Sequence, residues 1–153
     1  MKITLCGSYA FQARIESIAK ELEEHGHEVK YPSLPSTIVT SEGKDPLSIR
    51  AFIEEKGGID ALPAEHLVWD EKAKAIDNHF AKIAWADAIL VINFSKNDVD
   101  GYIGGNTLME IGVARSLSKK IYLMLRPSSK LSYLEEVLGT MPAIINEDLH
   151  KIV

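Results

Sequence analysis

A glycine-rich segment at residues 101–112 holds the side chains whose types and spacing most clearly indicate chemistry. It follows an apolar run at 88–94 that predicts a buried strand, and it leads into a helical pattern that continues through Leu117. Glycines at a strand-to-helix junction let a ligand approach the backbone, and the amides of the first helical turn point toward that ligand. We therefore predict that an anionic or sugar-like ligand is bound by Gly104, Gly105, Asn106 and Thr107.

Glu110 lies about one turn inside the predicted helix, where its carboxylate could meet a bound sugar. Thr107 and Glu110 also match a capping box, in which the glutamate side chain reaches back to the N-cap amide. Asn106 has two interpretations as well, because it could cap the helix or bond a ligand hydroxyl. Local spacing leaves both pairs of alternatives open.

The two common nucleotide-binding motifs are absent from this segment. A Walker loop needs a lysine after its last glycine, and the dinucleotide-binding fingerprint needs G-x-G-x-x-G spacing. Neither pattern occurs around Gly104 and Gly105.

A second candidate loop, Gly7-Ser8-Tyr9, follows the first apolar run of the chain. Ser8 could cap the helix that comes next, or it could bond a phosphate or a sugar hydroxyl together with neighbouring amides. We predict substrate contacts from all three residues of this loop.

The strands and helices on either side of these loops must position them, and the sequence predicts these elements from alternating patterns. Residues 3–5 predict a strand, 11–25 a helix ended by Gly26, and 27–31 a second strand, which together form a parallel unit with a right-handed crossover. Further along the chain, the patterns predict helices at 47–56, 64–85 and 132–139, and strands at 88–93, 120–124 and 143–145.

This order predicts an α/β fold: a three-layer, doubly wound parallel sheet, flavodoxin-like or Rossmann-like, in a single domain over 1–153. Ligands bind such sheets outside the carboxyl ends of the strands, so both glycine loops should face one crevice. Residues 33–66 are longer than a connection requires, which predicts a lid or a substrate-binding loop.

Composition excludes several classes of protein. The 153 residues carry a net charge of −5, with lysine and arginine spread along the chain, which argues against a nucleic-acid polymer as a partner. The one cysteine, Cys6, rules out an internal disulfide and a thiolate zinc cluster, and it is expected to be a packed small residue. Neither a signal peptide nor a membrane-spanning run is evident, so we expect a cytoplasmic protein.

The chain resembles the nucleoside 2-deoxyribosyltransferase superfamily, including the related nucleotide N-glycosidases with a flavodoxin-like core. The likeness covers the entry into Gly7-Ser8, the strand at 86–91 and, above all, residues 104–112. It implies an enzyme without a metal or redox cofactor that forms homodimers or larger homo-oligomers.

The resemblance implies that Glu110 is a nucleophile. It would attack the anomeric carbon of a nucleoside or nucleoside 5′-monophosphate and form a glycosyl intermediate, which water or a second base resolves. The alternatives are a non-catalytic nucleotide sensor on the same fold and a phosphoribohydrolase acting on a modified adenosine monophosphate.

An acid is also needed, because a base leaves poorly unless it is protonated. The family has an aspartate where this chain has His79, and Asp77 lies two residues earlier, about 200° around the helix. We favour His79, because an unperturbed histidine titrates near neutral pH. The transferases carry acidic residues where this chain has Gly104-Gly105, which favours a 5′-monophosphate over a free nucleoside.

Overall fold

The computed structural model describes residues 1–33, 37–38 and 47–153. They divide into two compact units, one made of residues 1–32 and 80–153 and the other of residues 33–79. The predicted excursion at 33–66 belongs to the second unit, and its residues 34–36 and 39–46 lie outside the described part. A single domain over the whole chain stays a prediction.

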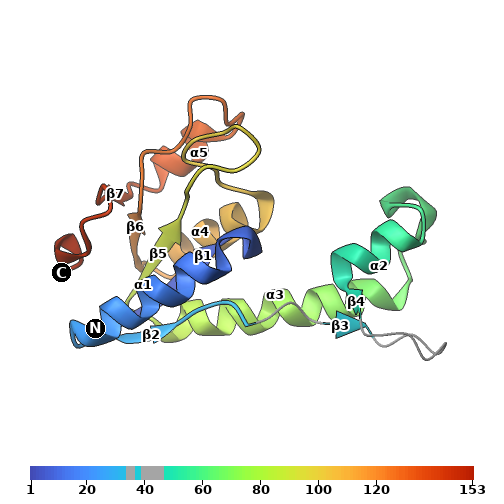
Figure 1. Cartoon of the computed structure of the whole chain (residues 1–153), viewed down its shortest axis with the longest axis horizontal. Helices are drawn as coiled ribbons and strands as arrows, with labels where there is room; N and C mark the ends of the chain where they lie inside the picture. Colours follow the sequence, from blue (N-terminus) through green and yellow to red (C-terminus); the bar gives the residue numbers. More distant parts are fainter. Residues whose placement is uncertain (34–36, 39–46) are drawn as a thin grey trace. The chain divides into compact units, whose positions relative to one another are not determined.

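The first unit contains the predicted parallel sheet, with strands in the order β2-β1-β5-β6-β7 (Figure 1). All four pairings are parallel. The order corresponds to the flavodoxin-like arrangement, in which the chain reverses direction across the sheet beside its first strand. The strands are β1 (Lys2–Gly7), β2 (Glu28–Lys30), β5 (Ala88–Ile92), β6 (Lys120–Leu123) and β7 (Ala143–Ile144).

Helices cover both faces of this sheet, which confirms the three-layer prediction. Buried apolar residues of α1 (Gln12–Glu24) pack against one face, and those of α4 (Gly105–Ser116) pack against the other. The second face is also covered by α5 (Leu134–Gly139) and by the last turns of α3 (Leu67–Trp85). Short 3-10 helices lie at Tyr9–Phe11 and Leu149–Lys151.

The alternation of side chains along β1 decides which residues meet which helix. Ile3 and Leu5 point into the cluster formed with α1, whereas Cys6 belongs to the cluster formed with α4. Since α1 leaves β1 toward one face and α4 follows β5 on the other, the adjacent carboxyl ends of β1 and β5 form the switch point. This is where the sequence placed the ligand crevice.

The second unit begins with a small antiparallel pair, β3 (Thr37–Ile38) and β4 (Leu47–Ser48), followed by α2 (Ile49–Glu55). The predicted helix at 47–56 therefore starts two residues too early, because residues 47 and 48 pair as a strand and Ser48 caps α2 through the amide of Ala51. The predicted helix at 64–85 is also too long, because α3 begins at Leu67. Among the described residues, no helix combines the length and apolar character that a membrane span requires.

Gly101 occupies a backbone conformation that its neighbours enforce. Its φ is +67°, and a Cβ atom there would overlap the carbonyl oxygen of Arg126. We predict that Gly101→Ala lowers the free energy of unfolding by about 2–4 kcal/mol, measured by urea denaturation.

Gly112→Ala is the matched control, because Gly112 lies within α4 and a Cβ there meets nothing within 4 Å. It should leave stability unchanged or raise it by about 0.5–1 kcal/mol. Equal effects of the two substitutions would contradict the assigned role of Gly101.

Candidate active site

The start of α4 excludes one of the two interpretations of Glu110. Gly104 is the N-cap, with extended backbone and no side-chain cap, and the helix begins at Gly105. The capping-box interpretation is therefore wrong, because Thr107 is already the third helical residue and cannot accept the role of N-cap. Asn106 does not cap the helix either, since it lies within the first turn, where it is exposed.

Glu110 points toward the sheet and not toward solvent. The buried residues of α4 recur at helical spacing, and they are Thr107, Glu110, Ile111 and Ala114. Glu110 is 9% exposed, at a position where the neighbouring residues of the same stripe pack into the core. Burying an ionisable side chain is unfavourable unless it gains specific partners, so this carboxylate has a role that packing alone does not explain.

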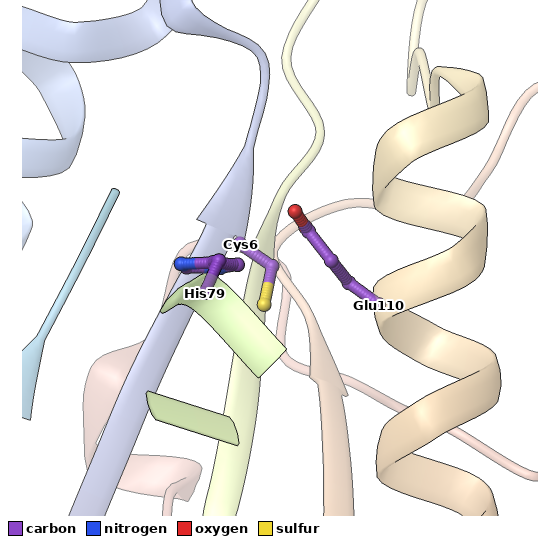
Figure 2. Close-up of side chains that lie close together, drawn as sticks. All are labelled: Cys6, His79 and Glu110. Carbon is purple, nitrogen blue, oxygen red and sulfur yellow. The ribbon is translucent and has the colours of Figure 1, made fainter. Parts of the chain in front are cut away.

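Cys6 is one partner of that carboxylate. Its sulfur and a Glu110 oxygen lie within 4.8 Å of each other, and Figure 2 shows the Glu110 side chain extending from α4 toward β1 and Cys6. Burial raises the pKa of the Cys6 thiol, and the negative charge of Glu110 raises it further. The thiol therefore keeps its proton at neutral pH, and it donates a hydrogen bond to the carbonyl oxygen of Thr4 at 4.0 Å.

Tyr9 is close enough to the same carboxylate for the charge to affect its phenol. Its side chain is 47% exposed. Partial burial and then the charge of Glu110 raise the pKa of the Tyr9 phenol, which keeps its hydroxyl protonated. This hydroxyl is partly exposed, and the charge of Glu110 acts on it. It is therefore suited to donate a hydrogen bond to a ligand.

Ser8 has the capping role that its position indicates, and its role in binding a ligand stays a prediction. Its hydroxyl accepts a hydrogen bond from the amide of Ala10, so it caps the 3-10 helix, and it also accepts from the ammonium of Lys96 at 2.7 Å. Lys96 comes from the loop after β5. The loops that follow β1 and β5 thus contact each other.

Lys96 was missed by reasoning from the sequence. It begins a tight turn in which Lys96 and Val99 exchange two backbone hydrogen bonds, while Asn97 and Asp98 take positive φ values of 51° and 58°. The Asn-Asp pair is a signal for such a turn, because these residues tolerate left-handed backbone. The signal marks the turn, but it does not reveal that the lysine reaches Ser8.

Tyr102 connects Lys96 to the N-terminus of α4. The Lys96 ammonium lies 5.1 Å from the centre of the Tyr102 ring, and a Cβ on Gly104 would lie 3.1 Å from the Tyr102 hydroxyl. A side chain at position 104 would therefore crowd the tyrosine. A lysine charge and the amide-rich end of a twelve-residue helix together favour an anionic group at this end of the sheet.

The two predicted acids lie on α3, in the second unit. His79 is buried and Asp77 is exposed, as expected for residues about 200° apart around one helix. Phe80, the next residue along the chain, belongs to the first unit and packs against the core cluster that contains Cys6. The role of either residue as an acid stays a prediction.

No protein-family model and no curated protein matches this chain. Solved structures do. A 2-deoxyribosyltransferase from Bacillus psychrosaccharolyticus aligns over 94% of this chain and 85% of its own, with a TM-score of 0.57 and 18% identity. A CMP N-glycosidase from Clostridium botulinum aligns over the same shares, with a TM-score of 0.48 and 19% identity. The chain thus has the α/β fold of the 2-deoxyribosyltransferase, the fold that the sequence resemblance implied.

Proposed function

We propose that this protein cleaves the N-glycosidic bond of a nucleoside, a deoxynucleoside or a nucleoside 5′-monophosphate, with Glu110 as the nucleophile. The observation that carries the proposal is the carboxylate of Glu110, buried on the sheet-facing side of α4 beside the end of β1. The fold supports it, because a 2-deoxyribosyltransferase is built on the same fold.

In the first step, a Glu110 oxygen bonds to the anomeric carbon of the sugar. The bond from that carbon to the base nitrogen breaks, and its electron pair stays with the base, which takes a proton from an acid. A covalent sugar ester of Glu110 results. Dividing the reaction in this way replaces one difficult displacement with two easier ones.

In the second step, the oxygen of a water molecule attacks the same carbon and the Glu110 carboxylate leaves. The proton of the water goes to the group that served as the acid in the first step. If the nitrogen of a second base attacks in place of water, the outcome is base exchange. We favour hydrolysis slightly, and both outcomes use the same Glu110 intermediate.

His79 is the acid that we propose, with Asp77 as the alternative. Its imidazole can donate and recover a proton near neutral pH, which a carboxyl group of ordinary acidity cannot do as well. Asp77 is exposed, whereas His79 is buried.

A 5′-phosphate is the anionic group that we propose for the loops at the end of β1 and β5. Ser8 and Lys96 supply a hydroxyl and an ammonium that are already hydrogen-bonded to each other. Gly104 and Gly105 open α4, whose first amides have no carbonyl partner within the helix. A homo-oligomer, a cytoplasmic location and the absence of a cofactor stay predictions.

The role of Glu110 is tested by incubating the protein with pooled ribo- and deoxyribonucleosides and their 5′-monophosphates. Mass spectrometry should detect a released base and a sugar-sized adduct on the wild-type protein. Glu110→Gln should bind ligand but lose about a thousandfold or more in turnover, because the amide is not a nucleophile. Glu136→Gln, at an exposed position of α5, is the control and should keep full activity.

Retention of a nucleotide without any released base would contradict the enzyme and support the sensor. Full activity of Glu110→Gln would leave cleavage intact but remove Glu110 as its nucleophile.

The acid is tested with His79→Asn and Asp77→Asn. We expect His79→Asn to lose about a hundredfold or more in kcat on an ordinary substrate, and Asp77→Asn to change little. If purines are accepted, an N7-methylated purine nucleotide should restore much of the activity of His79→Asn, because its charged base leaves without protonation. Loss in Asp77→Asn alone would reverse the assignment.

The phosphate site is tested by comparing a nucleoside with its 5′-monophosphate in Lys96→Ala. Removing the ammonium should lower kcat/KM for the monophosphate by about tenfold or more and leave the nucleoside almost unaffected. Lys20→Ala, at an exposed position of α1, is the control. Equal losses on both substrates would show that Lys96 does not recognise the phosphate.

A further inference from the structure

The loop between β5 and α4 is held by the loop between β6 and α5, which lies beside it (Figure 1). The amide of Ser128 donates to the carbonyl of Gly101 at 3.3 Å, and the ammonium of Lys130 donates to the carbonyl of Asp98 at 3.4 Å. The two loops also pack closely, because a Cβ on Gly101 would overlap the carbonyl of Arg126. The glycine-rich segment is thus fixed by contacts with a second loop.

Tyr133 makes a further contact of this kind, at the start of α4. Its hydroxyl donates a hydrogen bond to the carbonyl oxygen of Ile103, the residue directly before the N-cap Gly104. Ile103 is completely buried. The first carbonyl that accepts a bond from α4 is that of Gly104, which receives the amide of Leu108 at 2.9 Å. A buried carbonyl needs a donor, and for Ile103 the Tyr133 hydroxyl supplies it.

The Tyr133 side chain is itself held in place. Its ring packs against the core cluster that contains Ile103 and Ile111, and its backbone forms the N-cap of α5. Since a tyrosine has only two side-chain torsions, a packed ring also holds its oxygen. Burial and then the neighbouring Tyr102 raise the pKa of the Tyr133 phenol, so the hydroxyl keeps its proton and remains a donor.

The carbonyl of Ile103 and the amide of Gly104 belong to the same planar peptide unit. In a trans peptide the two groups point in opposite directions, so a bond that fixes the carbonyl also fixes the amide. In the part of the chain that the structure describes, the Gly104 amide has no hydrogen-bond acceptor. Because Gly104 and Gly105 have no side chains to restrict their backbone, the direction of this free amide depends on contacts made from outside.

We propose that Tyr133 is a positioning residue: by binding the carbonyl of Ile103, its hydroxyl directs the Gly104 amide toward the 5′-phosphate of the substrate. The inference rests on the phosphate site of the proposed function and deepens it. Tyr133 acts through one peptide unit and does not touch the substrate. A donor that is oriented before the anion arrives binds it more tightly than one that must be ordered on binding.

The alternative explanation is that Tyr133 merely stabilises the fold. Tyr122 provides a matched control, because its hydroxyl also donates to a backbone carbonyl, that of Val153, at 2.8 Å. Tyr133→Phe and Tyr122→Phe each keep the ring and lose one such bond. Both should therefore lower the urea midpoint by similar amounts. Only Tyr133→Phe should change the binding of phosphate.

The first experiment observes the Gly104 amide without any turnover. The backbone amide resonances of Gly104 and Gly105 are followed by NMR during a titration with inorganic phosphate. They should shift with the same Kd in the wild type and in Tyr122→Phe. In Tyr133→Phe we expect the Kd to rise about fivefold, the equivalent of one neutral hydrogen bond. An unchanged Kd in Tyr133→Phe would overturn the positioning role.

The second experiment compares a nucleoside with its 5′-monophosphate as substrates. Tyr133→Phe should lower kcat/KM for the monophosphate by about fivefold and change that for the nucleoside by less than about twofold. Tyr122→Phe should leave both values unchanged. A merely structural role would lower both values alike, so equal losses on the two substrates would overturn the proposal.

The two experiments also separate this inference from the proposed function. If the wild type releases a base but phosphate shifts neither glycine amide, cleavage stands, whereas the phosphate site and the role of Tyr133 are wrong. If the amides respond to phosphate and depend on Tyr133 but no base is released, cleavage is wrong. The positioning role then holds for a protein that binds a nucleotide without turnover.

Discussion

The burial of one carboxylate is the constraint on which the site depends. Glu110 takes a place on the core-facing stripe of α4 that packing alone would assign to an apolar residue. The site must therefore provide polar neighbours, and the Cys6 thiol is one of them. Partial removal from water also makes the interactions of this charge stronger than they would be at the surface. An ionisable group is thus held at a position where an apolar residue would pack better.

The topology of the sheet explains why these neighbours come together. β1 and β5 are adjacent, and the helices that follow them cover opposite faces, so the carboxyl ends of these two strands form the switch point of the sheet. Asn93, at the end of β5, supports this arrangement. Its amide group bonds both the carbonyl and the N–H of Leu125, at 2.8 Å and 2.9 Å, and so joins the ends of β5 and β6. A rigid frame then carries the loops with Ser8 and Lys96.

Reasoning from the sequence was most successful where the signal is periodic. The stripe of Ile15, Ile18 and Leu22 predicted α1, and the positive φ of Gly26 agrees with its predicted role as the end of that helix. It failed where two different local structures fit the same short stretch of sequence. Thr107 and Glu110 satisfy the spacing of a capping box, yet α4 begins before Thr107, because Gly104 takes the N-cap position. Residues 47 and 48 looked helical, but they pair with β3 as a strand.

The sequence by itself determined the succession of strands and helices, the doubly wound parallel sheet and the glycine-rich segment that contains Glu110, because all of these follow from spacing along the chain. Only the tertiary structure decided which distant residues meet. Cys6 appeared to be a small core residue, and Lys96 appeared to be one surface lysine among many. Their contacts with Glu110 and Ser8 depend on strand order and on which side of β1 faces α4, and neither is encoded in any local pattern.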